Sequence, residues 1–262
     1  MTSRWTGGAV TARAHCVLAP NASPMTLDGT NTWVLHEPGS GEAVVVDPGP
    51  QHEGHLNRVL DVLEGLGARV SATLLTHGHL DHSEGAARFA ELTGSPVRAL
   101  DPALRLGEEG LGEGDVVRVG GLVVEVVATP GHTADSLSFL LPADAAVLTG
   151  DTVLGRGTTV VAHPDGRLED YLDSLERLRG LSASGAVATV LPGHGPALSD
   201  ATEVIGQYLA HRQERLEQVR AALAAGDRTP REVVERVYAN VDRALWPAAE
   251  QSVRAQLEYL RC

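Results

Sequence analysis

Three histidines and one aspartate lie within six consecutive positions of the segment THGHLDHSEGA, residues 76–86. Side chains two positions apart in an extended chain point the same way, so His77 and His79 can bind one ion as a pair. Asp81 and His82 come after the expected bend into a helix and point elsewhere. The spacing therefore favours two metal sites over one.

The same arrangement recurs where three further apolar segments end. His132 follows VVEVVATPG, Asp151 follows AAVLTG, and His194 follows AVATVLPG. Because the carboxyl ends of neighbouring strands lie side by side in α/β sheets, we expect these side chains to converge with the first four. Imidazole and carboxylate groups suit Zn²⁺, and they also suit iron or manganese.

Apolar segments alternate with segments of helical period over residues 1–198, which indicates an α/β domain. The predicted elements are strands at 42–47, 71–76, 136–141, 145–150 and 185–191, a hairpin over 115–129 that turns at Gly120-Gly121, and helices at 52–67 and 168–180. Each strand that precedes a candidate ligand is short and rich in valine, leucine or alanine, as buried strands are.

From residue 199 the strand patterns stop and helical patterns take over. Ser199 is the expected cap of a long helix that ends at Gly226. The segment TPRE, 229–232, has the residues of a capping box with proline at the first helical position. A last helix is expected near Pro247. The sequence therefore predicts two domains, 1–198 and 199–262, the second small and helical.

The 262 residues carry a formal net charge of −13, and every one of the 21 basic residues is arginine. An acidic chain argues against a protein that binds nucleic acid by broad electrostatic attraction. The only cysteines are Cys16 and Cys262, so no disulfide framework is expected. No apolar run has the length of a signal peptide core or a membrane span, so we expect a cytoplasmic protein without a membrane partner.

Four segments in combination resemble the metallo-β-lactamase fold superfamily, in its hydrolase rather than its true lactamase branch. They are HGHLDH at 77–82, TPGHT at 129–133, TGDT at 149–152 and PGHG at 192–195. The resemblance covers about residues 15–198. It implies an α/β fold of the αβ/βα four-layer sandwich type with a dinuclear site at one edge. It also implies the ligand sets: His77, His79 and His132 for one metal, Asp81, His82 and His194 for the other, with Asp151 bridging both.

Three further features narrow the resemblance to the β-lactamase-like protein 2 branch, whose tail is a winged-helix-like domain. They are TLDGTNTWVL at 26–35, GRGTTVV at 155–161 and the helical tail. Members of that branch include a mitochondrial single-strand endoribonuclease, and related fungal proteins are acyl-carrier-protein thioesterases. Glyoxalase II is also related, but its Gly-Cys-Gly-Arg motif and its lysine contacts have no counterpart in this chain. The persulfide dioxygenases, which keep one iron, are a further alternative.

The expected function is a zinc-dependent hydrolase with two ions per chain, in which a hydroxide bridging the metals attacks a small ester or an acyl thioester. Asp81 is the expected catalytic residue, because its free oxygen can orient the hydroxide and move a proton. Two alternatives remain open. One is a single-strand-specific endoribonuclease with RNA as the partner. The other is a non-catalytic, metal-stabilised module that binds nucleic acid or another partner.

Residues around the expected site have two interpretations each. Asp47 either orients a ligand histidine or caps a turn. Asn31 and Thr133 either border the pocket or hold a loop. His163 either reaches substrate or lies on a surface loop, and Trp246 is expected to pack between tail and main domain. Three arginines on one helix either meet phosphate or form a solvated, ion-paired face: Arg212, Arg215 and Arg220. The remaining histidines are expected at the surface or in the core: His15, His36, His52, His55 and His211.

Overall fold

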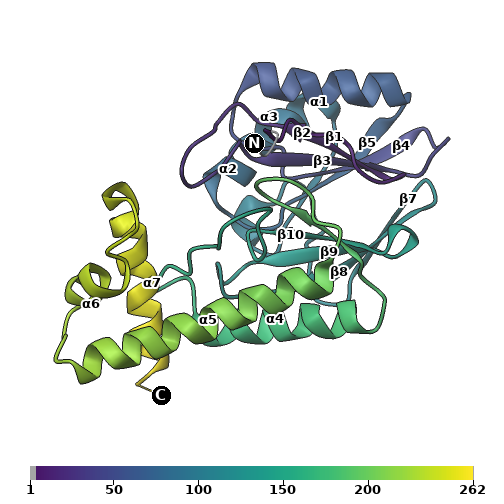
Figure 1. The fold of residues 1–262 in the computed structure, drawn as a ribbon. Helices are drawn as coiled ribbons and strands as arrows, with labels where there is room; N and C mark the ends of the chain where they lie inside the picture. The colour runs from purple at the N-terminus through teal and green to yellow at the C-terminus, as the bar shows by residue number, and fades with distance from the viewer. Residues whose placement is uncertain (1–3, 262) are drawn as a thin grey trace.

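Two β-sheets pack face to face and carry helices on both outer faces (Figure 1). The structure is a computed structural model and describes residues 4–261. The four layers run from α1 and α3, through the first and second sheets, to α4 and α5. The predicted αβ/βα sandwich is confirmed. No helix within these residues is long and apolar enough to cross a lipid bilayer.

The first sheet has six strands in the order β1-β2-β3-β4-β5-β6. Its strands β4, β5 and β6 are parallel, and the others are antiparallel. The elements of this half are β1 Gly8–Ala9, β2 Ala14–Leu18, β3 Asn31–His36, β4 Glu42–Val46, α1 Glu53–Leu66, β5 Arg69–Leu74, α2 Leu80–Ser83, α3 Ala86–Thr93 and β6 Val97–Arg98. Parallel β4 and β5 end at the same edge, directly before Asp47 and the cluster at 77–82.

The second sheet has five strands in the order β11-β10-β9-β8-β7. Since β8 and β10 are both antiparallel to β9, and β11 is parallel to β10, strands β8, β10 and β11 run the same way. The elements of this half are η1 Pro102–Leu104, β7 Val116–Val119, β8 Leu122–Ala128, β9 Leu137–Leu141, η2 Pro142–Asp144, β10 Ala146–Gly150, α4 Leu168–Ala183 and β11 Thr189–Pro192. The expected convergence therefore uses strand ends from two sheets, not from one.

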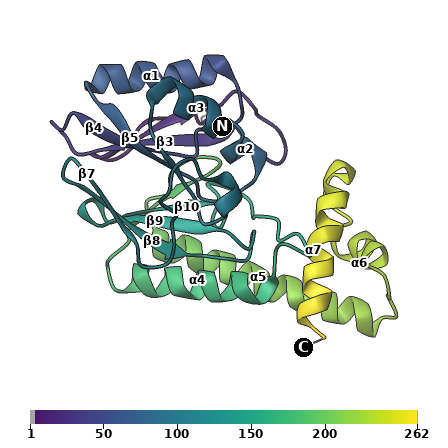
Figure 2. The same cartoon turned by 180° about the vertical axis from the view of Figure 1, so that it is seen from behind.

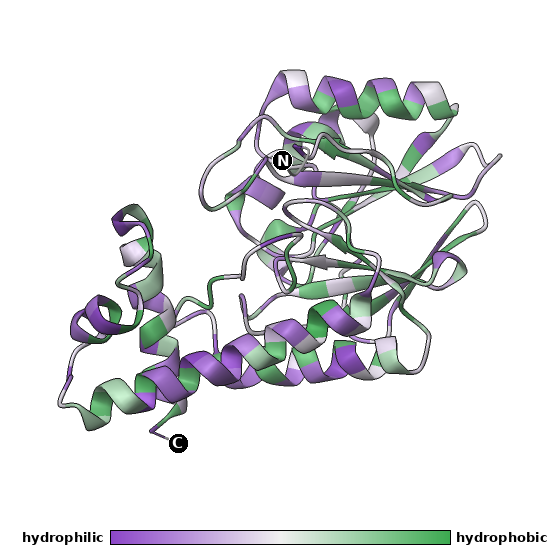
Figure 3. Ribbon diagram, viewed as in Figure 1, coloured by the Kyte–Doolittle hydropathy of each residue, from purple (hydrophilic) through white to green (hydrophobic). Residues whose placement is uncertain are grey.

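Strand alternation explains the layers. In β3, Trp33 and Leu35 face the core between the sheets, whereas Val34 faces the core beneath α1. Both strand faces are apolar because both are covered. Phe139 of β9 lies in the core between the sheets, and Val147 of β10 packs under α4. Figure 3 shows the same pattern, with hydrophobic residues on the inward sides of the elements and hydrophilic ones outside.

The tail consists of α5 Ala201–Ala224, α6 Pro230–Val237, η3 Arg243–Leu245 and α7 Trp246–Tyr259. Helix α5 lies along α4 and continues beyond it into the tail (Figure 2). Its Ile205 and Tyr208 pack with the main domain, whereas Val219 and Ala222 pack with α6 and α7. The predicted division at 198/199 thus falls at the start of one helix shared by both parts, and it stays a prediction.

Most element predictions are confirmed within a few residues. Gly67 ends α1 in the left-handed conformation, and the hairpin β7–β8 turns at Gly120-Gly121, where both φ angles are positive. The capping box at Thr229 is present. The cap of α5 was predicted wrongly, because Asp200 rather than Ser199 accepts the hydrogen bond from Glu203 N. Strands β2 and β3 had no counterpart among the predicted elements.

Candidate metal centre

Four of the predicted ligands gather at the edge where the strands end: His77, His79, His132 and Asp151. Each offers one ligand atom, and these atoms all lie within 4.8 Å of one another. His79 Nδ1 lies 3.1 Å from His77 Nε2 and 3.1 Å from His132 Nε2. Two of the residues follow β5 in the first sheet, and the other two follow β8 and β10 in the second. This set could hold one metal ion.

The other three predicted ligands form a second group with the same property: Asp81, His82 and His194. His194 Nε2 lies 3.2 Å from Asp81 Oδ2 and 3.3 Å from His82 Nε2. The short helix α2 turns the chain after His79 and carries Asp81 and His82, and the His82 ring lies 4.3 Å from that of His77, between centroids. The two groups contain the residues predicted for two sites, and the number of ions that they bind stays a prediction.

Asp151 lies between the two groups. Its Oδ1 is 3.4 Å from His82 Nε2 and 3.4 Å from His194 Nε2, while its Oδ2 is 3.6 Å from His132 Nε2. Oδ1 is buried and has no hydrogen-bond partner in the part of the chain that the structure describes. A buried carboxylate oxygen without a donor indicates a cation as its natural partner.

Hydrogen bonds on the outer side of the imidazoles fix which nitrogen faces the centre. His82 Nδ1 contacts Asp47 Oδ2 at 2.8 Å, His132 Nδ1 contacts Val160 O at 2.7 Å, and His194 Nδ1 contacts Gly29 O at 3.2 Å. Each Nδ1 therefore donates to an oxygen, which leaves the Nε2 lone pair of the neutral ring directed inward. In the neutral form of both rings, the Nε2 lone pairs of His82 and His194 face one another at 3.3 Å, and a metal ion bound there takes the place of the proton that His194 otherwise carries.

The charges of the site follow from burial and from its carboxylates. Burial lowers the pKa of His77 and of His132. Burial raises the pKa of Asp81, but a hydrogen bond from His194 and the nearby imidazoles lower it to about 2. Burial likewise lowers the pKa of His194, but Asp151 and Asp81 raise it to about 9. Ionised carboxylates thus make the second group attractive to a positive charge.

Glycine is required where the chain passes behind the site. A Cβ on Gly193 would lie 2.7 Å from Asp151 Oδ1 and 2.7 Å from His82 Cε1. Only glycine lets the segment after β11 approach this closely, so that His194 reaches the second group.

The residues with two interpretations are now placed. Asp47 contacts His82 and also accepts hydrogen bonds from Thr76 N and Thr76 Oγ1, so it both orients a histidine and holds a turn. Asn31 holds a loop, since its Nδ2 donates to Pro192 O and Gly195 O. Thr133 also holds a loop, through Asp135 and Ser136.

One prediction about the tail was wrong, and one of two alternatives was excluded for Arg212. Trp246 packs with Val219, Val233 and Val253 inside the tail, because η3 and the start of α7 turn its ring toward α5 and α6. Arg212 is buried rather than solvated, and it donates to Thr159 O at 2.7 Å. Arg220 is exposed and paired with Glu217, as expected for a surface face. His55 is a core histidine bonded to Thr32 Oγ1.

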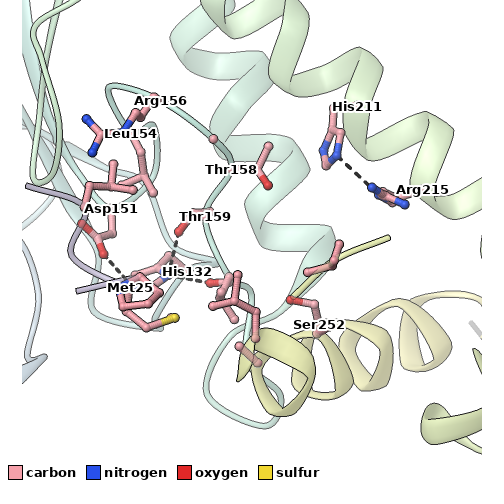
Figure 4. A pocket seen from close by; sticks show the side chains of 18 of the residues that line it. Met25, His132, Asp151, Leu154, Arg156, Thr158, Thr159, His211, Arg215 and Ser252 are labelled. Atoms are coloured by element: carbon pink, nitrogen blue, oxygen red, sulfur yellow. Dashed lines mark hydrogen bonds and ion pairs between the residues drawn. The ribbon is translucent and has the colours of Figure 1, made fainter. Parts of the chain in front are cut away.

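A pocket adjoins the centre at His132 and Asp151 and extends to the tail (Figure 4). Its volume is about 320 Å³. The walls come from residues 24–27 and 154–160, from α5, and from the segment 238–252. No local sequence pattern indicates this pocket, because its two walls are far apart in the chain. A separate cleft beside His79 is lined by three carboxylates, Asp101, Asp135 and Asp165.

The fold has two sheets between helices, and a cluster of potential metal ligands lies at the edge where the strands end. This combination defines a class of metal-dependent hydrolases. The profile described as Metallo-beta-lactamase superfamily matches residues 25–194, so the chain belongs to this superfamily and is a hydrolase of that class. The profile described as Beta-lactamase associated winged helix domain matches residues 229–261 of the tail. Both parts of the predicted resemblance are confirmed.

Individual relatives agree with this assignment. Beta-lactamase-like protein 2 homolog of Caenorhabditis elegans is 32% identical over 254 residues, which cover 93% of this chain and 82% of that protein. Atrochrysone carboxyl ACP thioesterase of Aspergillus fumigatus is 35% identical over 225 residues, covering 83% and 67%. The crystal structure of a Beta-lactamase domain protein from Burkholderia ambifaria superposes with a TM-score of 0.81 at 26% identity, covering 97% of this chain and 87% of that one.

Proposed function

We propose that the chain is a dinuclear zinc hydrolase that cleaves acyl thioesters or small esters. The position of Asp151 carries the proposal. One of its oxygens faces His82 and His194, and the other faces His132. A carboxylate shared in this way suits two ions held side by side, and a closed structural zinc site has no need of it.

The donor set fits zinc, because it consists of imidazoles and carboxylates without a competing thiolate. His77, His79 and His132 would hold one ion, Asp81, His82 and His194 the other, and Asp151 both. Zinc bound there supplies Lewis-acid chemistry, which activates water and polarises a carbonyl group.

Asp81 is the residue that we assign to proton transfer. Its side chain is 29% exposed, whereas that of Asp151 is 11% exposed, so Asp81 is the more open of the two carboxylates. It is ionised at neutral pH, because its pKa is lowered to about 2. Its Oδ2 lies 3.3 Å from Thr30 Oγ1 and 3.2 Å from His194 Nε2. From this position Oδ2 orients the attacking water and accepts its proton.

The surroundings of the centre favour a small acyl substrate over RNA. The pocket beside His132 and Asp151 is lined largely by apolar residues, among them Leu27, Leu154 and Val160. The carboxylates of the cleft beside His79 repel a polyanion that would cross the centre. The similarity to a fungal ACP thioesterase also supports a thioester substrate.

The test measures metal content and hydrolysis together. We expect close to two zinc ions per chain by elemental analysis, and turnover of a butyryl thioester that depends little on salt. RNA cleavage by a nuclease contacting several phosphates would instead lose affinity steeply, with a slope of about −0.7 per phosphate on single strands.

Asp81→Asn is the control for contaminating activity, and it should lower kcat by roughly 100-fold or more while leaving the circular dichroism spectrum unchanged. Fast, salt-sensitive RNA cleavage that this substitution abolishes would contradict the thioester proposal. One tightly bound iron per chain would contradict the dinuclear zinc site.

A further inference from the structure

The pocket between the main domain and the tail contains a buried cation without a counter-charge. Arg212 of α5 is 4% exposed, and its guanidinium lies 4.7 Å above the ring of Tyr171. One of its nitrogens donates to Thr159 O, but Nε is buried without a hydrogen-bond partner among residues 4–261. No carboxylate of the described chain lies within ion-pair distance of Arg212. Buried charges are costly unless they are paired, so this guanidinium favours an anion as a partner.

Two neighbours on the same helix add to this positive region. Arg215 also lines the pocket and stacks on Tyr238, at 4.7 Å, and within the described part of the chain it too has no carboxylate partner. Its Nε donates to His211 Nε2 at 3.4 Å, which Figure 4 shows. His211 Nδ1 therefore carries the ring hydrogen, and this atom is buried and unpartnered within residues 4–261. All three side chains line the pocket: Arg212 Nε and His211 Nδ1 have no partner among residues 4–261, and Arg215, whose Nη1 donates to Gln218 Oε1 and Val237 O, keeps Nη2 for a further acceptor.

The positive region and the metal centre lie at different walls of one pocket. His132 and Asp151 belong to the main domain, whereas His211, Arg212 and Arg215 belong to α5. The apolar residues Leu27, Leu154 and Val160 line the same pocket. A further arginine that lines the pocket, Arg156, is already paired with Asp28. A volume of about 320 Å³ is that of a small-molecule site, since such sites range upward from about 300 Å³.

We propose that this pocket binds a substrate arm whose far end is an anionic group, a carboxylate or a phosphate, held by Arg212, Arg215 and His211. The inference rests on the proposed function and adds the substrate class to it. An apolar stem fills the middle of the pocket, the anion meets the arginines, and the scissile carbonyl lies at the metal centre. The anion belongs either to the acyl part or to the leaving group of the thioester.

Two matched pairs of substrates separate these sources. The first pair is glutaryl and butyryl N-acetylcysteamine, which differ by a carboxylate on the acyl part. The second pair is butyryl 4′-phosphopantetheine and butyryl pantetheine, which differ by a phosphate on the leaving group. In one of the two pairs, the anionic substrate should have a kcat/KM roughly tenfold or more above that of its neutral partner, because it gains a hydrogen bond to a charged group. In Arg215→Met this ratio should fall to near one.

Arg220→Met is the matched control, because Arg220 is exposed on the same helix and paired with Glu217. It should keep the wild-type ratio. Calorimetry on the wild-type protein provides a readout that needs neither turnover nor a variant. Glutaramate should bind roughly tenfold or more tightly than the neutral butyramide if the acyl part carries the anion, and 4′-phosphopantetheine more tightly than pantetheine if the leaving group does.

The outcomes separate this inference from the proposed function. Hydrolysis of all four thioesters with ratios near one overturns the anion site and leaves the hydrolase proposal intact. No hydrolysis of any thioester by the zinc-loaded protein overturns the proposed function, and the calorimetric comparison then decides the anion site alone. A ratio lost equally in Arg220→Met also contradicts the inference, because the effect would then reflect general surface charge.

Discussion

Asp47 connects the backbone turn after β4 to the metal centre. It adopts a left-handed φ of 51°, which is unusual for a residue with a side chain, and its carboxylate bonds both to Thr76 and to His82. Outer partners of this kind fix the orientation of a ligand imidazole and raise its basicity. We therefore expect the residue to affect metal binding without touching the ion.

Asp47→Asn should weaken zinc binding at the second group by roughly 10- to 100-fold, because one amide oxygen cannot replace both carboxylate oxygens. Chelator competition measures this affinity. Asp61→Asn, an exposed position on α1, is the matched control and should bind zinc as the unchanged protein does. Equal affinities in the two variants would mean that Asp47 serves the turn alone.

The candidate ligands could be predicted from the sequence because each directly follows an apolar strand segment. Arg212 could not be predicted. Its partner Thr159 is 53 positions away, and on a helix rich in charged residues an arginine is expected to be solvated. Burial of such a residue depends on how α5 lies against the loop 154–160, which no local pattern records.

At the scale of elements, close contacts between a loop and a helix position His132. Gly131 has a φ of +128°, and a Cβ there would lie 2.3 Å from Tyr171 Cα of α4. The loop after β8 therefore rests directly on the backbone of the helix. Any side chain at position 131 must displace α4 or withdraw His132 from the centre.

Gly131→Ala should lower the free energy of unfolding by about 3 kcal/mol or more, since backbone strain and overpacking each contribute about 1–3 kcal/mol. Urea unfolding monitored by circular dichroism measures the change. Gly65→Ala is the control, because this glycine lies in the exposed part of α1 with open space around it. It should stabilise by about 0.5–1 kcal/mol through helix propensity. Similar values for both alanines would disprove the close-contact argument.

Strands β2 and β3 show why the predicted element list was incomplete. Asn31 and Thr32 are polar and would ordinarily weaken a buried strand, but both are fully buried and hydrogen-bonded, Asn31 to Pro192 O and Thr32 to Asp47 O. The polar pattern results from the contacts of the site, which only the tertiary structure supplies.

At the scale of the whole molecule, α5 joins the two parts. Its first half packs on α4, and Tyr208 OH accepts a hydrogen bond from Leu154 N in the loop beside the pocket. The second half carries the tail, whose Ala248, Ala249 and Ser252 complete the pocket wall. The tail thus forms part of the pocket wall, while the candidate ligands all precede it.

Deletion of residues 227–262 should leave the zinc content near two per chain but lower kcat/KM for a butyryl thioester by roughly tenfold or more, because part of the apolar wall is lost. Elemental analysis and a thioester assay measure both. A cut after residue 198 is the comparison and should yield insoluble protein, since Ile205 and Tyr208 cover the main domain. Loss of zinc from a soluble 1–226 protein would contradict the separation of roles.

Both candidate ion sites draw on both halves of the main domain. Positions 77–82 follow the first sheet, whereas His132, Asp151 and His194 follow the second. An ion bound there works as a reversible cross-link between the halves, and it binds the native chain in preference to the unfolded one. By mass action, each site adds about 4.1 kcal/mol of stability when free zinc is about 1,000 times its Kd. We therefore expect removal of zinc to lower the free energy of unfolding as well as to stop turnover.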